Sequence, residues 1–222
     1  VGTPVWEIGT YHLDDNQGPF PIGFNFPWYE NSFDQLYVTT EGWISFTSTS
    51  NAYSNQPLPN SGSSVPENLL AALWDDLVHR SGTGSEPTPS AVYYYNDGSR
   101  FIIQWDDMYP IANYTNALDF EIILYPNGKV VYQYQQSDLG SHQNSFTIGW
   151  QNQAKDDGWT IVHNDASYVH DDLAIEISAG PEWLTVDPPT GVVPAGECTT
   201  LTVGFDSAEL DEGDYDGLIT IL

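Results

Sequence analysis

Alternation of apolar residues with a period of two is the feature of this chain that most limits its fold. Residues 20–26 place a large apolar side chain at every second position, and after a turn-prone break at 27–34 two more such runs flank Glu41 and Gly42. Successive side chains of a strand point to opposite faces, so this spacing is typical of a half-buried strand. The pattern recurs toward the C-terminus and leaves little room for helices. The sequence therefore predicts an all-β fold.

The predicted strands are joined by recognisable turns. Asn96-Asp97-Gly98 and Pro126-Asn127-Gly128 each separate two apolar runs and supply the positive φ angles of tight hairpins. Two polar loops, 47–67 and 81–90, are expected on the surface. The sequence predicts strands over 20–26, 35–40, 43–48, 69–74, 91–96, 100–106, 118–125, 129–135, 145–151, 159–163 and 172–178.

We interpret residues 1–179 as one large antiparallel β-sandwich. The side chains predicted to face its interior are Phe24, Phe26, Val38, Ile44, Phe46, Trp74, Ile102, Trp105, Ile123 and Val131. Composition shifts near Ala179-Gly180-Pro181, and residues 180–222 carry about three strand-like runs. A free-standing sandwich has about seven strands, so the second domain is expected to be an incomplete β module.

Charge excludes several classes of partner. The chain has 31 acidic and 4 basic residues, giving a net charge of −27. Nucleic acids and anionic membranes both require a positive face, so neither is expected to bind. The charge favours divalent cations, a saline medium or a basic partner. No apolar run reaches 18 residues, so no membrane insertion is expected. The lone Cys198 excludes an internal disulfide and is expected to be buried.

Paired aspartates are the candidate metal ligands. Five Asp-Asp pairs occur, and calcium prefers six to eight oxygen ligands. Aspartate also ends strands and caps turns without any metal, and that reading stays open for every pair. The predicted calcium ligands are Asp14, Asp15, Asp75, Asp76, Asp106 and Asp107.

No motif in the sequence indicates catalysis. The five histidines do not have zinc-ligand spacing, no Gly-x-Ser-x-Gly turn occurs, and Gly128-Lys129 is followed by valine rather than the serine or threonine of a phosphate-binding loop. A glycosidase needs only two carboxylates that the fold brings together, but nothing selects such a pair. We therefore expect a protein that is not an enzyme.

Four segments in this order resemble the nidogen-like extracellular β domain and its bacterial relatives: FPWYENSFDQLYVTTEGWISF, NLLAALWDDL, AVYYYNDGSRFIIQW and FEIILYPNGKVVYQY. Trp28, Glu30, Glu41 and residues 71–73 depart from the family's commonest residues. The resemblance covers roughly residues 5–178. It implies a secreted or cell-surface module without catalytic activity, and it implies no particular ligand or binding residues.

Residues 181–222 are similar to the first part of a bacterial immunoglobulin-like module of the BACON type. The similarity rests on Trp183-Leu184, on the turn from Gly191 to Gly196, and on the segment from Gly213 to Gly217. Further strands normally follow in that family. The resemblance therefore implies a small, incomplete immunoglobulin-like module.

Two functions from different classes remain open. The first is a structural or adhesive protein of the cell surface that assembles with itself into filaments through β contacts between subunits. Its expected interface is the terminal run Leu218, Ile219, Thr220, Ile221 and Leu222. A competing explanation of this run stays open: the chain is a fragment of a longer protein, or the segment packs on its own first domain. The alternative is a carbohydrate-binding accessory module of an exported enzyme, in which exposed tyrosines or tryptophans stack on sugar rings. Expected partners are accordingly other subunits or a surface glycan.

Overall fold

The computed structural model describes residues 2–83, 88–111, 117–137, 144–165, 167–178, 183–187 and 196–208, with the single residues 193, 210 and 213. The chain divides into two compact units, Val1–Ile177 and Ser178–Leu222, which we describe separately. The predicted boundary between residues 179 and 180 lies outside the described residues. The described part of the chain is all β, and it holds no helix long and apolar enough to cross a membrane.

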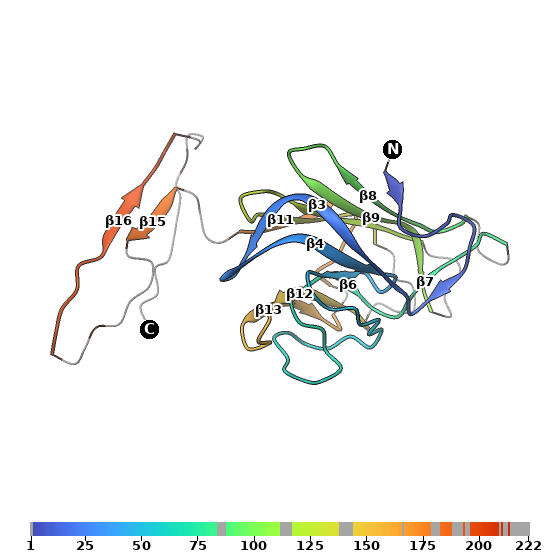
Figure 1. Cartoon of the computed structure of the whole chain (residues 1–222). Helices are drawn as coiled ribbons and strands as arrows, with labels where there is room; N and C mark the ends of the chain where they lie inside the picture. The colour runs from blue at the N-terminus through green and yellow to red at the C-terminus, as the bar shows by residue number, and fades with distance from the viewer. Residues whose placement is uncertain are drawn as a thin grey trace. The chain divides into compact units, whose positions relative to one another are not determined.

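The first unit is a sandwich of two antiparallel sheets (Figure 1). The eight-stranded sheet has the order β1-β8-β9-β10-β11-β14, with β7 paired to the end of β9 and β2 paired to β7. Its strands are β1 (Thr3–Pro4), β2 (His12–Leu13), β7 (Leu77–His79), β8 (Ala91–Asn96), β9 (Phe101–Pro110), β10 (Leu118–Leu124), β11 (Val130–Gln136) and β14 (Leu173–Ile177).

The six-stranded sheet has the order β13-β12-β6-β5-β4-β3. The two strands at the other end of this order, β3 and β4, form one long hairpin that closes at Trp28 and Asn31. The break predicted at 27–34 is therefore mostly strand. The strands are β3 (Asn16–Trp28), β4 (Asn31–Thr39), β5 (Trp43–Ser45), β6 (Leu69–Trp74), β12 (Thr147–Gln151) and β13 (Gly158–His163).

Aromatic side chains fill the space between the sheets and hydrogen-bond across it. The indole Nε1 of Trp105 donates to Thr39 O at 2.9 Å, and the Tyr132 hydroxyl donates to Gly149 O at 3.1 Å. A buried polar group without a partner is costly, so these bonds let large aromatic rings lie fully inside. The predicted interior positions Phe26, Val38, Ile44, Phe46 and Trp105 are confirmed, and Phe24 packs at their margin.

Four predicted interior positions were wrong. Trp74 is buried on the far side of its sheet, in a second cluster. Ile102, Ile123 and Val131 alternate with interior residues of β9, β10 and β11 and therefore point away from the core. Both faces of these strands are partly apolar. A one-residue difference in phase exchanges the faces, so the period alone did not identify the inner one.

The long loop between β5 and β6 covers the outer face of the six-stranded sheet. Leu58 and Val65 of the loop pack on Trp43 and Trp74 of the sheet. The two indole Nε1 atoms donate to the same acceptor, the carbonyl oxygen of Ala52, at 3.0 and 2.8 Å. The centre of the six-stranded sheet, at β5 and β6, is therefore buried on both faces.

The second unit contains one described hairpin, β15 (Leu184–Asp187) paired with β16 (Thr202–Phe205). Phe205 is 75% exposed and stacks on Trp183 with ring centroids 6.2 Å apart. Cys198 is exposed rather than buried, and it lies in the segment without regular secondary structure that precedes β16. The predicted interface Leu218–Leu222 lies outside the described residues.

Candidate functional site: an acidic cluster and an open sheet face

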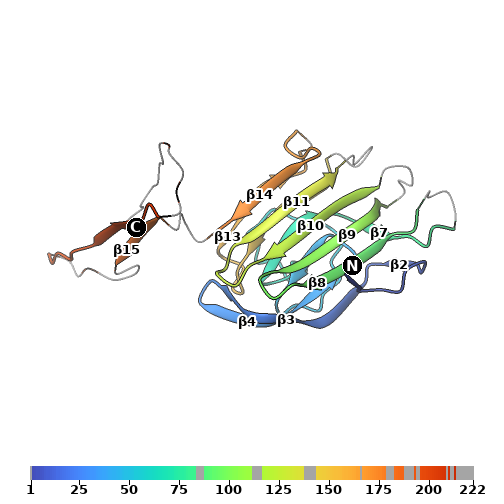
Figure 2. The same cartoon turned by 90° about the horizontal axis from the view of Figure 1, so that it is seen from above.

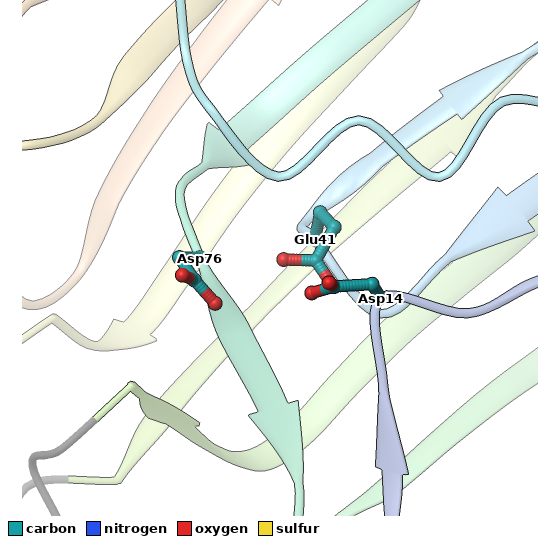
Figure 3. A group of neighbouring side chains, drawn as sticks. All are labelled: Asp14, Glu41 and Asp76. Carbon is teal, nitrogen blue, oxygen red and sulfur yellow. The ribbon is translucent and has the colours of Figure 1, made fainter.

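Three carboxylates from distant parts of the sequence meet at one end of the β2–β7 pair (Figure 3). Asp14 directly follows β2 and Asp76 directly precedes β7. They are close because Leu13 and Val78 are paired in an antiparallel register. Glu41 comes from the turn between β4 and β5. One oxygen of each carboxylate lies within 4.8 Å of the other two.

Glu41 is fully buried at the base of this acidic cluster. Its Oε1 accepts a hydrogen bond from Thr40 Oγ1, and its Oε2 accepts one from the Leu77 backbone N–H at 2.9 Å. Burial raises the pKa of Glu41 to about 9, against the lowering effect of the two hydrogen bonds, and the charges of Asp14 and Asp76 raise it further. Glu41 therefore holds a proton at neutral pH unless a cation replaces that proton.

Asp14 is held in the left-handed region at φ 50°, which aspartate tolerates better than most residues. Its Oδ1 is buried and accepts no hydrogen bond from the described residues. Burial also raises the pKa of this carboxyl group. Three clustered carboxylates supply the hard oxygen ligands that calcium prefers, and carbonyls or water would complete its shell.

The structure separates the predicted aspartate pairs. Asp14 and Asp76 enter the acidic cluster, whereas their sequence neighbours do not. Asp15 accepts a hydrogen bond from Trp6 Nε1 at 3.0 Å and lies 2.9 Å from His12 Nδ1. Asp75 is buried and accepts a hydrogen bond from Ser145 Oγ at 2.9 Å.

Glu41 was not among the predicted ligands. The available signal was an acidic residue inside an otherwise uncharged strand–turn–strand segment. The remaining predicted pair, Asp106 and Asp107, lies on β9 away from this cluster. The backbone N–H of Asp107 donates to Asp119 Oδ1 at 2.7 Å. Among the described residues, Asp14, Glu41 and Asp76 form the one group of three whose oxygens come this close together.

The second notable surface is the outer face of the eight-stranded sheet, which we call the open sheet face, or open face. Figure 2 looks onto it. The strand registers place a polar row across five strands and, next to it, a more apolar row. The polar row is Tyr93, Gln104, Glu121, Gln133 and Ala174. The apolar row is Tyr95, Ile102, Ile123 and Val131, and it ends at Glu176.

A groove of about 470 Å³ lies on this face over β10, β11 and β14. Its polar lining includes Gln104, Asp119, Glu121, Gln133 and Asp172. Asp106 stands nearby on the same face of β9, two residues beyond Gln104. Burial raises the pKa values of Asp106, Asp119 and Glu121, so all three carboxylates are partly removed from water.

Exposed aromatic side chains are distributed over both sheets. On β8 the three tyrosines alternate, so that Tyr94 packs against Phe20 in the core while Tyr95 is 45% exposed on the open face. The largest exposed aromatic side chain of the first unit is Trp159 of β13, which is 63% exposed and belongs to the other sheet.

Comparison with known proteins gives one family. The model of a family described as NIDO related matches residues 2–179, which is most of the chain and nearly all of the first unit. No solved structure matches the chain.

Proposed function

The chain belongs to the NIDO-related family, and on that premise we propose that it is a non-catalytic adhesive or structural domain, secreted or held at a cell surface, that binds its partner on the open sheet face. Domains of this family are typically extracellular. The proposal assigns binding to the surface defined above by the polar row, the apolar row and the groove.

The observation that carries the proposal is the difference between the two outer faces. Residues 46–67 cover the centre of the six-stranded sheet and bury Trp43 and Trp74 beneath them. On the eight-stranded sheet, Gln133 and Ala174 are exposed at a groove, and Tyr95 is exposed on β8. A concave surface with converging polar groups and adjacent apolar area is the usual form of a binding site.

The test is binding by the whole chain to a glycan array, to an immobilised basic protein and to its own immobilised copies. The face variant carries Tyr95→Ala, Gln104→Ala and Gln133→Ala. The matched control carries Tyr53→Ala, which removes a 49% exposed tyrosine from the covering loop. The proposal is supported if the face variant loses binding to one of the three surfaces and the control keeps it. Equal behaviour of both variants on all three surfaces contradicts it.

Carbohydrate binding is the alternative form of this function. Exposed Tyr95 and the amides of Gln104 and Gln133 support it, because sugars bind by ring stacking and hydrogen bonds to planar polar groups. Binding of a neutral glycan that is lost in the face variant would favour this form over protein adhesion.

A second candidate function, self-assembly, is supported by the second unit. Its described hairpin has only two strands, and isolated two-stranded hairpins are marginally stable in water. Phe205 exposes most of its ring, which another subunit could cover. We propose association through residues 181–222. Light scattering of the full chain should then show concentration-dependent polymers, and deletion of 181–222 should leave a monomer. A monodisperse full chain at high concentration contradicts the proposal.

We also propose calcium as a structural ion of the acidic cluster. Support comes from the burial of Glu41 and from the Asp14 oxygen that accepts no hydrogen bond within the described part of the chain. The ion would replace the proton on Glu41 and join β2, β7 and the β4–β5 turn. The melting experiments in the Discussion test this assignment.

A further inference from the structure

We propose that the partner of the open sheet face is a lysine- or arginine-bearing segment of another protein, bound with its cationic groups at the carboxylates of Asp106, Asp119 and Glu121. The inference rests on the proposed function, because it names the chemistry of the ligand for the same face. It follows from charge, from the surface beside the charges and from the positions of the chain's own basic residues.

The carboxylates occupy neighbouring positions on one face. Glu121 belongs to the polar row, Asp106 stands on the neighbouring strand, and Asp119 lies on β10 two residues before Glu121. All three are half-buried. Asp119 and Asp107 both act on Asp106, and their charges disfavour its ionised form. Like charges that are held together and partly desolvated gain most from a ligand of opposite sign.

The chain's own basic side chains have other principal partners. Arg100 pairs with Asp97 at 2.9 Å, and its charge also acts on Glu121, where it lowers the pKa against the raising effect of burial. Lys155 donates to the carbonyl oxygens of Gly62 and Val65. Lys129 is 3.7 Å from the Glu176 carboxylate at the end of the apolar row, and Arg80 stands 5.5 Å above the Tyr11 ring. Asp106 and Asp119 therefore present charge that an external cation can neutralise, because no basic side chain in the described part of the chain acts on either of them.

The apolar row beside these carboxylates distinguishes a basic side chain from a bare metal ion. Ile102 and Val131 occupy the next positions on the same face of β9 and β11 and are partly exposed, whereas Ile123 between them on β10 is buried. Lysine and arginine have an aliphatic stem behind the charged head, and the stem packs on apolar surface while the head stays polar. Gln104 and Gln133 offer further acceptors for a guanidinium or ammonium group.

The same surface is less suited to a sugar. Stacking needs a broad exposed ring, and Tyr95 is the main one on this face, at the end of the apolar row. The more exposed Trp159 lies on the other sheet. Charge on this face also acts at a distance: a chain with net charge −27 attracts a basic partner before contact and increases its association rate at low salt.

The experiment measures binding of a fluorescein-labelled decalysine peptide to the full chain by anisotropy. The charge variant is Glu121→Gln with Asp106→Asn. The control is Glu30→Gln with Asp34→Asn, which removes the same charge from exposed positions in the turn and second strand of the β3–β4 hairpin. The charge variant should bind the peptide about tenfold more weakly and the control less than about twofold. Raising NaCl from about 50 to about 300 mM should weaken the wild-type complex strongly.

A second variant distinguishes weaker peptide binding from loss of folding. Gln133→Lys changes an exposed residue and supplies a cation inside the groove, so it should weaken peptide binding while the melting temperature stays unchanged. Equal weakening in the charge variant and the control means that net charge alone attracts the peptide, which overturns the inference. If the charge variant keeps peptide binding and the face variant loses a neutral glycan, the ligand class is overturned and the proposed function stands. If the charge variant and the face variant both match their controls on every probe, both proposals are overturned.

Discussion

Trp105 donates a hydrogen bond from its indole Nε1 to the carbonyl oxygen of Thr39, 2.9 Å away in the opposite sheet. The indole ring is fully buried and stacks on Phe120 with centroids 5.1 Å apart. One side chain thus contributes both apolar contact and a polar link between the two layers of the sandwich.

Replacement of Trp105 by alanine should lower the free energy of unfolding by about 3–5 kcal/mol, the range for a buried large aromatic residue. Thr39 O would also lose its indole donor. Urea titration followed by circular dichroism measures the loss. The control is Trp159→Ala at the 63% exposed position, where we expect less than about 1 kcal/mol. Equal losses at both positions would contradict the interior placement of Trp105.

Gly42 should not tolerate alanine. Its φ is +71°, and an added Cβ would lie 2.0 Å from the carbonyl oxygen of Leu73. We expect Gly42→Ala to cost more than about 2 kcal/mol, because strain and a backbone clash act together. Gly98→Ala separates the two causes: φ is +88° there, but an added Cβ meets nothing within 4 Å. Gly98→Ala, as the control, should cost only about 1 kcal/mol. Urea titration of both variants measures the two losses.

The buried Glu41 predicts a pH dependence of stability. Its folded-state pKa is raised to about 9 from the ordinary value of 4.5, so the folded state holds a proton that the unfolded state releases. This contribution to stability is complete below pH 4.5 and is lost as the pH rises through about 9. In the absence of calcium, the free energy of unfolding should therefore fall between pH 6 and pH 9.

Glu41→Gln should flatten this profile, because glutamine is neutral at every pH and resembles the protonated acid in shape. Glu30→Gln, at an exposed position, is the control and should keep the wild-type slope. Melting temperatures from about pH 6 to about pH 9 in chelator-treated buffer provide the measurement. An identical slope in wild type and Glu41→Gln would show that other groups cause the pH dependence.

Calcium should raise the melting temperature of the wild-type chain more than sodium at the same ionic strength, since a specific site adds to general screening of the carboxylates. The increase should be larger at pH 9 than at pH 6, where the proton on Glu41 competes with the ion. Glu41→Gln and Asp14→Asn should abolish the calcium-specific part. Equal effects of both salts would remove the specific site and leave screening alone.

Much of the fold was predictable because hydrophobic alternation and hairpin turns are local. The strands β6 and β8 have the ends that the sequence predicts, and Gly98 and Gly128 lie at the expected turns with positive φ. The short strands β1, β2 and β7 were missed. They have two or three residues, so no period can be read from them, and their pairing partners are distant in sequence.

The candidate site was only partly predictable for a related reason. Paired aspartates indicate acidity, but the backbone turns at Asp14, whose φ is 50°, so Asp14 and Asp15 lie in different surroundings. The cluster instead depends on the register of β2 with β7 and on a turn that delivers Glu41. Likewise, the apolar alternation in β9–β11 does not show which of the two faces of each strand packs on the other sheet. The sequence of a single strand does not contain that information.

The shared acceptor at Ala52 has a consequence for how this chain tolerates change in length. Two indoles that meet at one carbonyl oxygen fix the distance along the loop from β5 to Ala52 and from Ala52 to β6. An insertion on either side moves the acceptor from at least one ring and uncovers tryptophan surface. The tip of the β8–β9 hairpin at Gly98 faces open space instead. Extra residues, an epitope or a labelled tag belong at that tip, and the covering loop should be left at its present length.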